Sequence, residues 1–321
     1  MSETELLEKG RHHQQIIAKV KGLEPIRTAV VCPVDTVSLL GAVEAAKANL
    51  ITPVLVGPEE KIRAAALRAQ LDLSAYELES AENNSAASSR AVAMVREAKV
   101  DALMKGDLHT DELMHAVVDP LHGLRTDRRI SHIFVMDVAS YPRPLLLTDA
   151  AINIFPTLDD KRDIVQNAID LAHALGVTLP KVAILSAEET VRSKIPSTVE
   201  AGALCKMADR GQITGGILDG PLAFDDAISA EAAKTKGIVS PVAGQADVLV
   251  VPDLEAGNML EKQLVYLAGA EVAGIVLGAR VPIILTSRAD KTLIRLSSCA
   301  LALLWAHYSA TCGSSPVVGS S

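Results

Sequence analysis

The sequence contains few aromatic side chains. Phe, Trp and Tyr together account for 2% of its 321 residues, whereas hydrophobic residues of all kinds account for 49%. Alanine, valine, isoleucine and leucine must therefore fill the protein's cores. Such side chains are typical of parallel strands that are covered by helices on both faces, so the composition favours an α/β fold. A chain of this length usually forms more than one hydrophobic core, and we expect two domains.

Cysteine is scarce as well. The four cysteines, at positions 32, 205, 299 and 312, lie far apart and include no Cys-x-x-Cys pair. This spacing argues against both a disulfide framework and a zinc cluster. It favours a protein that works in a reducing compartment.

The chain also lacks an excess of positive charge and a long apolar run. Its formal net charge is −8, whereas a nucleic-acid-binding protein should present a basic face. The first residues, MSETELLEKGRHHQQ, contain no apolar signal core, and no apolar run approaches the length of a membrane span. We therefore expect a cytoplasmic protein that binds neither nucleic acid nor membranes.

Several motifs that would identify a class of enzyme are absent. The sequence has no Gly-x-x-x-x-Gly-Lys-Ser/Thr loop, no His-Glu-x-x-His and no Gly-x-Ser-x-Gly. The segment GQITGG at 211–216 lacks the spacing of a dinucleotide-binding fingerprint. These absences argue against a phosphate loop of the ATPase type, a zinc protease helix and a nucleophilic serine elbow.

Short apolar runs instead alternate with longer helical patterns. Asp35 and Thr157 are suitable N-caps for two of the helices, and Gly176 is suited to end the second one. The alternation predicts an α/β fold made of two α/β/α domains with mainly parallel sheets. We expect strands at 26–32, 51–57, 101–106, 129–138, 181–186, 215–220 and 246–253, and helices at 35–49, 156–176, 197–209 and about 290–307.

Ligands of open parallel sheets bind beyond the carboxyl ends of the strands. Polar residues that directly follow an expected strand are therefore candidates for a functional site. Among the candidates named below, the aspartates Asp149, Asp219 and Asp253 are expected to order their loops rather than to carry chemistry. The candidate positions are Lys105 to Asp107, Asp149 to Asn153, Ser186, Asp219 with Gly220, Asp253 to Asn258, and Ser287 with Arg288.

From about residue 100 onward the chain resembles the phosphate acetyltransferase and phosphate butyryltransferase family. The most specific matching segments are PDLEAGN, at 252–258, and PIILTSRAD, at 282–290. Further matching segments, in the same order as in the family, are RRISHIFVMD, LTDAAINIFPT, VAILS and ILDGPLAFDDAIS. Residues 1–100 match the family only in their general pattern.

The resemblance implies a reaction in which acyl-CoA and phosphate form acyl phosphate and CoA, reversibly. It implies CoA and phosphate as substrates, no cofactor and no metal, and a homodimer. It also implies two α/β domains with the active site in the cleft between them. The last helix of the chain would return to the first domain, so that domain one comprises 1–139 plus 286–321 and domain two comprises 140–285.

The implied chemistry directs attention to Ser287 and Arg288. The phosphate needs a cation, and the carbonyl oxygen needs hydrogen-bond donors as it gains negative charge in the transition state. The resemblance implies that Arg288 holds the phosphate and that Ser287 donates to the carbonyl or a phosphate oxygen. The alternative is that Ser287 only caps the following helix and that Arg288 is a surface residue.

A base is needed to deprotonate the CoA thiol when acyl-CoA is formed. Acetyltransferases of the family place an aspartate several residues after the Ser-Arg pair, but the later position is not acidic in SRADKTLIRL. Asp290 is nearer and is our candidate for the base. It is equally suited to cap the final helix.

Five more residues are candidates for substrate binding. Arg129 matches a basic position of the family and would bind the CoA phosphates or the transferred phosphate. Arg128 competes for that role, although both arginines are also consistent with a solvated turn. Lys105 ends an expected strand at KGD, and Asn153 and Asn258 lie in matched loops, where an asparagine can bond a ligand or fix its own loop.

The leading interpretation is transfer of a short acyl group, most simply acetyl. The length of the acyl chain is not readable from the sequence, because one methylene contributes only about 1–3 kcal/mol to discrimination. A phosphate butyryltransferase is therefore an alternative. Two others are a sensor that binds acyl-CoA or phosphate without turnover, and a two-domain hydroxy-acid dehydrogenase, which would need an acidic metal site.

Overall fold

The computed structural model describes residues 10–285 and 291–312. The chain divides into two compact units. Unit 1 comprises 1–12 and 129–272, and unit 2 comprises 13–128 and 273–321. Ser287, Arg288 and Asp290 lie outside the described residues. The expected domain boundaries, 1–139 plus 286–321 and 140–285, stay a prediction.

Unit 2 contains a sheet whose strands follow the order β3-β2-β1-β4-β11-β10. Neighbouring strands are parallel except for β10 and β11, which pair antiparallel. The carboxyl ends of β1, β2 and β4 therefore lie at one edge of this sheet. Its strands are β1 (Ile26–Val31), β2 (Ile51–Gly57), β3 (Glu77–Ser80), β4 (Ala102–Lys105), β10 (Glu271–Leu277) and β11 (Ile283–Ile284).

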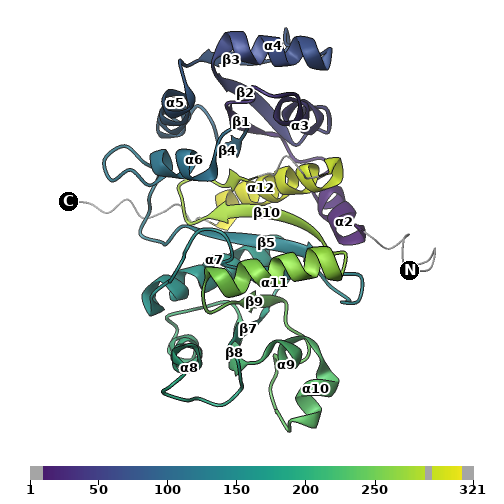
Figure 1. Cartoon of the computed structure of the whole chain (residues 1–321), viewed down its shortest axis with the longest axis vertical. Coiled ribbons are helices and arrows are strands. Elements are labelled where there is room, and N and C mark those ends of the chain that lie inside the picture. The colour runs from purple at the N-terminus through teal and green to yellow at the C-terminus, as the bar shows by residue number, and fades with distance from the viewer. Residues whose placement is uncertain (1–9, 286–290, 313–321) are drawn as a thin grey trace. The chain divides into compact units, whose positions relative to one another are not determined.

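Helices cover both faces of the unit 2 sheet. Figure 1 shows α3 on one side of β1 and β2, and α5 with α6 on the other. The Asp35 side chain accepts a hydrogen bond from the Ser38 backbone N–H at 3.0 Å, which confirms the expected N-cap of α3. The helices are α2 (Arg11–Lys19), α3 (Thr36–Lys47), α4 (Glu59–Ala69), α5 (Asn84–Arg96), α6 (Thr110–Val117) and α12 (Thr292–Cys312).

Unit 1 contains strands in the order β5-β6-β9-β7-β8. All neighbouring pairs are parallel except β5 and β6, which are antiparallel, with Ile133 opposite Thr148. This pairing places the start of β5 at the same edge of the sheet as the end of β6. The strands are β5 (Ser131–Asp137), β6 (Leu145–Thr148), β7 (Lys181–Leu185), β8 (Ile217–Leu222) and β9 (Val248–Val250).

The longest helix of unit 1, α7, follows the expected signals. Thr157 and Asp160 form a capping box at its start, and Gly176, with φ of +88°, occupies the left-handed position just after its end. Glycine adopts this conformation without steric cost. The helices of unit 1 are α7 (Leu158–Ala174), α8 (Pro196–Asp209), α9 (Phe224–Ile228), α10 (Ala230–Thr235) and α11 (Leu254–Leu267).

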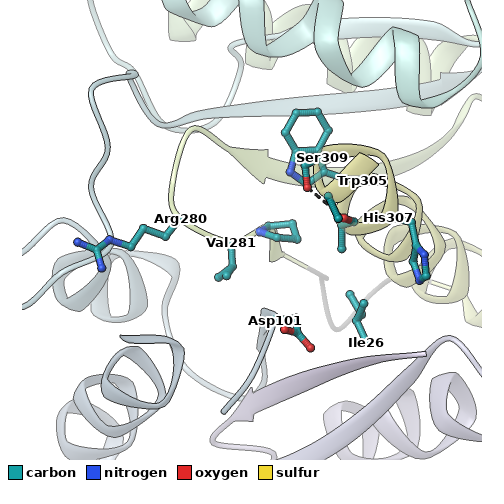
Figure 2. Close-up of a pocket in the computed structure, with 10 residues that line it drawn as sticks. Ile26, Asp101, Arg280, Val281, Trp305, His307 and Ser309 are labelled. Carbon is teal, nitrogen blue, oxygen red and sulfur yellow. Dashed lines mark hydrogen bonds between the residues drawn. The ribbon is translucent and has the colours of Figure 1, made fainter. Parts of the chain in front are cut away.

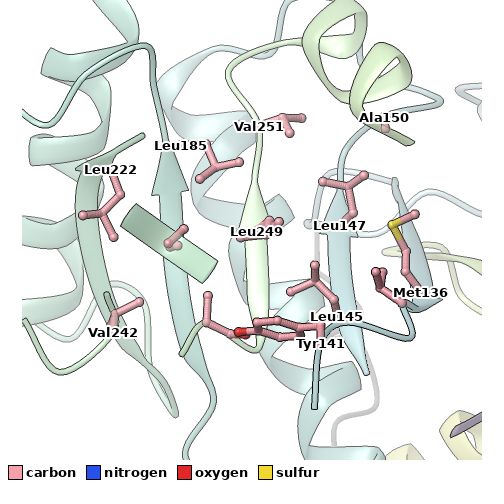
Figure 3. Packing of buried hydrophobic residues seen from close by; sticks show 14 of the residues in the cluster. Met136, Tyr141, Leu145, Leu147, Ala150, Leu185, Leu222, Val242, Leu249 and Val251 are labelled. Carbon is pink, nitrogen blue, oxygen red and sulfur yellow. The ribbon is translucent and has the colours of Figure 1, made fainter. Parts of the chain in front are cut away.

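The core of unit 1 on the α11 side of the sheet consists of aliphatic side chains. Leu147 and Leu249 are fully buried on the adjacent strands β6 and β9, and Tyr141 lies at one margin of the cluster (Figure 3). The Tyr141 hydroxyl donates to the Ala246 carbonyl at 2.6 Å, so this buried polar group is satisfied. The expectation of aliphatic cores and mainly parallel α/β sheets is confirmed.

One buried polar side chain has an unusual environment. His132, on β5, is 2% exposed, and its ring lies edge-on to that of Phe134 at a centroid distance of 4.2 Å. Its Nδ1 atom is buried and has no hydrogen-bond partner among the described residues. Burial disfavours the charged form, so the pKa of the imidazole falls from 6.5 to about 3. His132 is therefore neutral in the folded protein at neutral pH.

This histidine should make the protein sensitive to mild acid. The unfolded imidazole takes up a proton near pH 6.5 but the folded one only near pH 3, so stability is lost as the pH falls below 6.5. Between pH 6.5 and about pH 5 the free energy of unfolding should fall by roughly 1.5 kcal/mol more in the wild type than in His132→Gln. Urea unfolding at each pH measures this difference.

The matched control is His115→Gln, at an exposed position on α6. This variant should keep the pH dependence of the wild type. A His132→Gln variant whose unfolding free energy follows the wild-type pH dependence would contradict the assignment of the acid sensitivity to His132.

Candidate functional site

A cluster of polar side chains lies at the edge of the unit 1 sheet where β6 ends and β5 begins. Asp149 and Asn153 follow β6, and Arg129 precedes β5. Because β5 and β6 are antiparallel, residues on either side of them meet at this edge although 24 positions separate Arg129 from Asn153. The three side chains are joined by hydrogen bonds, and we call them the Arg129 cluster.

Asp149 forms the buried end of the Arg129 cluster. It is 4% exposed, and its Oδ1 atom accepts from the backbone N–H groups of Ala151, at 3.0 Å, and Ile152, at 3.1 Å. Its Oδ2 atom accepts from the backbone and side-chain nitrogens of Asn153, at 3.2 and 2.5 Å. Burial raises the pKa of this carboxyl group, and the four hydrogen bonds offset only part of that effect.

Asn153 links the buried end to the surface. It is 2% exposed, and its Nδ2 atom donates to the Ile130 carbonyl at 2.9 Å as well as to Asp149. Its Oδ1 atom accepts from Arg129 Nε at 2.6 Å. The asparagine therefore fixes the loop that follows β6 and also contacts the guanidinium.

Arg129 forms the exposed end, with 49% of its side chain accessible. Its Nε atom bonds Asn153, its Nη1 atom lies 3.5 Å from Asp160 Oδ1, and its backbone N–H donates to Asp163 at 2.9 Å. Within the described part of the chain, its Nη2 atom has no protein partner. A half-exposed guanidinium that is held on one side can present its remaining donors to an anion.

Asp160 contacts both Arg129 and the start of α7. Its Oδ2 atom accepts from the Thr157 backbone and hydroxyl, at 2.9 and 2.8 Å, while Oδ1 faces Arg129. Burial raises the pKa of the Asp160 carboxyl, but the bonds from Thr157 and the charge of Arg129 outweigh this and lower it. Sequence reasoning did not identify Asp160 as a partner of Arg129. The capping-box pattern TLDD was its only sequence signal.

The neighbouring loop after β9 packs against the same segment. Asp253 caps α11 by accepting from the Ala256 N–H at 2.9 Å, so the expectation that Asp149 and Asp253 order their loops is confirmed. Asn258 is exposed, and its Nδ2 atom lies 3.5 Å from the Ala150 carbonyl, at the limit of a hydrogen bond. Its side chain is therefore positioned beside the loop that carries the Arg129 cluster.

Two further candidates lie in unit 2. Lys105, at the end of β4, directs its Nζ atom to the carbonyls of Gly106, at 3.4 Å, and Leu108, at 3.1 Å. Arg128 donates its backbone N–H to Thr126 Oγ1 at 3.1 Å.

The residue after Lys105 must be a glycine for steric reasons. A Cβ atom at Gly106 would lie 2.5 Å from the Val31 carbonyl oxygen, so the ends of β1 and β4 can approach closely only with glycine there.

The structure thus brings Arg129 and Asn153 into direct contact and places Asn258 close to the same loop. Lys105 and Arg128 belong to the other unit. Roles of all these residues in substrate binding stay predictions, as do those of Ser287, Arg288 and Asp290.

A pocket of about 330 Å³ lies elsewhere in unit 2, near the amino ends of β1, β4 and β11. Figure 2 shows Ile26 and Asp101 on one side of it and Trp305 on the other, with the Arg280 side chain extending away from them. None of the predicted site residues lines this pocket. Parallel sheets bind ligands at the opposite ends of their strands, so we do not assign the pocket to the active site.

Two features are absent from residues 10–285 and 291–312. No cluster of three or more His, Cys, Asp or Glu side chains there is arranged to hold a metal ion. None of the helices found there combines the length and apolarity that a membrane crossing requires.

Two relatives match nearly the whole chain in sequence. The chain is 61% identical to a phosphate acetyltransferase of Rhizobium meliloti over 294 residues, which is 92% of this chain and 93% of the relative. It is 40% identical to a phosphate butyryltransferase of Clostridium acetobutylicum over 290 residues, 90% of this chain and 96% of the relative.

A solved structure shares both the fold and part of the sequence. A branched-chain phosphotransacylase from Enterococcus faecalis V583 superimposes with a TM-score of 0.76 and 29% sequence identity, over 88% of this chain and 99% of that one. The model of the family described as phosphate acetyl/butaryl transferase matches residues 77–302. The chain belongs to this family of acyltransferases, as the strand-end segments PDLEAGN and PIILTSRAD indicated.

Proposed function

We propose that the protein is a phosphate acetyltransferase, which interconverts acetyl-CoA and phosphate with acetyl phosphate and CoA. The observation that carries this proposal is the 61% identity to the Rhizobium meliloti enzyme along nearly the whole of both chains. The butyryltransferase relative is more distant, at 40% identity, which favours acetyl over butyryl as the transferred group.

The reaction sets two tasks for the side chains, namely proton transfer at the CoA thiol and the binding of two anionic substrates. A phosphate oxygen attacks the acetyl carbonyl carbon, the C–O bond forms, and the C–S bond breaks as CoA leaves and takes up a proton. In the reverse direction a base removes the proton from the CoA thiol. Two anionic substrates must also be held together, which requires cations and hydrogen-bond donors.

Residues of the family motif would carry out these tasks. Arg288 would hold the phosphate and Ser287 would donate to the carbonyl or a phosphate oxygen. Asp290 would take the thiol proton. Arg129 would bind a substrate phosphate group, with Arg128 and Lys105 as further cations and Asn153 and Asn258 as polar neighbours.

The experiment that tests the proposed function is release of CoA from acetyl-, propionyl- and butyryl-CoA, detected with a thiol reagent, without added metal or nicotinamide. Release that requires phosphate and is fastest with acetyl-CoA supports the proposal. A preference for butyryl-CoA would make the protein a butyryltransferase. Binding of CoA without release would indicate a sensor. A separate assay with a hydroxy acid, a nicotinamide cofactor and a divalent metal tests the dehydrogenase alternative, which metal-dependent reduction of the nicotinamide would indicate.

Arg288→Ala should lower kcat by roughly two to three orders of magnitude, because an electrostatic donor to the transition state is lost. Steady-state kinetics of the phosphate-dependent release measure this. Arg63→Ala is the matched control, since Arg63 is an exposed arginine on α4 that pairs with Glu59. A variant at Arg288 that folds normally and keeps the wild-type rate would remove this residue from the mechanism.

Asp290→Asn should slow the formation of acetyl-CoA and flatten its dependence on pH, because an amide cannot accept the thiol proton. The rate of acetyl-CoA formation from acetyl phosphate and CoA, followed across a range of pH, measures both effects. If the variant retains the wild-type pH profile, the base is another residue and Asp290 serves as a helix cap.

We also propose that the protein is a cytoplasmic homodimer that uses CoA and phosphate as substrates and no cofactor. The family resemblance supports the dimer. Light scattering coupled to gel filtration should give a mass of about twice the 33.8 kDa of one chain. A mass of 33.8 kDa at the concentrations used for the assay would contradict the dimer.

A further inference from the structure

The amide of Asn153 can take only one orientation in the Arg129 cluster. Both partners of Nδ2 are acceptors, namely the Ile130 carbonyl and the Asp149 carboxylate, and the partner of Oδ1 is the Nε donor of Arg129. If the amide were rotated by half a turn, its oxygen would face two acceptors and its nitrogen would face a donor, so all three hydrogen bonds would be lost. The orientation of the carbonyl oxygen that faces Arg129 is therefore set by buried groups on the other side of the residue.

The Asp149 carboxylate anchors the Asn153 amide from the buried side. All four of its partners are donors, and three of them are backbone N–H groups of the loop that also carries Asn153. Since the carboxylate is 4% exposed, its hydrogen bonds are not shared with solvent. The loop, the carboxylate and the amide form one buried hydrogen-bonded unit.

The guanidinium, in contrast, is half exposed and is held at two points. Asn153 accepts from Nε, and Asp160 lies beside Nη1. A long arginine side chain loses considerable rotamer entropy when it is held in one geometry. A fixed acceptor at Nε removes part of that loss before an anion binds and leaves the Nη2 side accessible.

We propose that Asn153 is a positioning residue for Arg129. With Asp149 behind it, Asn153 holds the guanidinium in the orientation that binds a phosphate group of a substrate. The proposal rests on the proposed function, because it assumes that Arg129 binds either inorganic phosphate or a phosphate group of CoA.

The test is a double-mutant cycle with Asn153→Ala, Arg129→Ala and the double variant, in which KM for phosphate and KM for acetyl-CoA are measured separately. Asn153→Ala should raise one of the two KM values by about ten-fold, the effect of weakening a hydrogen bond to a charged group. The KM that rises identifies the bound group as inorganic phosphate or as CoA. In the Arg129→Ala background the same substitution should change that KM by no more than about two-fold.

Asn167→Ala is the matched control. Asn167 is also buried, and its amide donates to the Arg129 carbonyl and to Ser131, but it does not contact the guanidinium. It should lower the thermal stability without raising either KM. Should Asn153→Ala fail to fold, Asn153→Ser retains a hydroxyl donor for Asp149 and lacks the carbonyl oxygen that accepts from Nε.

Three results would overturn the role of Asn153. These are unchanged KM values in Asn153→Ala, an equal rise of KM in the Arg129→Ala background, and the same rise in Asn167→Ala. The wild type, measured in parallel, tests the proposed function by itself. Absence of phosphate-dependent turnover in the wild type would reject that function, whereas normal wild-type turnover with any of the three results would reject only the positioning role.

Discussion

The antiparallel pairing of β5 with β6 is the constraint on which the Arg129 cluster depends. In a purely parallel sheet the residues before a strand lie at the amino edge, far from the carboxyl edge where ligands bind. Reversal of β5 brings Arg129, which precedes its strand, to the edge where Asp149 and Asn153 follow β6. The hydrogen bonds of Asn153 then join the two segments.

The cluster combines a buried anion with a half-exposed cation. Asp149 lies in an environment that excludes water, and this burial raises the pKa of its carboxyl group. Its four hydrogen-bond donors lower the pKa but offset only part of that rise. Asp160 is in the opposite situation, because its bonds to Thr157 and the charge of Arg129 outweigh burial. The surroundings of these two carboxyl groups thus shift their pKa values in opposite directions, upward for Asp149 and downward for Asp160.

Much of the fold follows from local signals. Asp35, Thr157 and Gly176 mark the ends of α3 and α7 where the structure has them, because caps depend on a few neighbouring residues. The short strand β6, LLLT, and the helix α6 were not assigned from the sequence. Both segments are too short to show a periodic pattern of apolar residues that would distinguish them from a loop. The strand β6 is defined instead by its pairing with β5 and β9.

The site was only partly predictable for the same reason. A strand-end position identified Asn153, and the family motif identified Arg129, but the contact between them depends on the direction of β5. The orientation of the Asn153 amide depends on the nearby Asp149 carboxylate and on two groups that are distant in the sequence, the Arg129 guanidinium and the Ile130 carbonyl.

The difference in exposure between the two ends of the cluster has a consequence for ionic conditions. Mobile ions reach Arg129, of which 49% of the side chain is accessible, but not Asp149, which is 4% exposed. Screening by salt therefore acts on the attraction between the guanidinium and a dissolved anion and leaves the link between Asn153 and Asp149 intact. An increase in electrolyte can weaken capture of a charged molecule without loosening the loop that presents the charge.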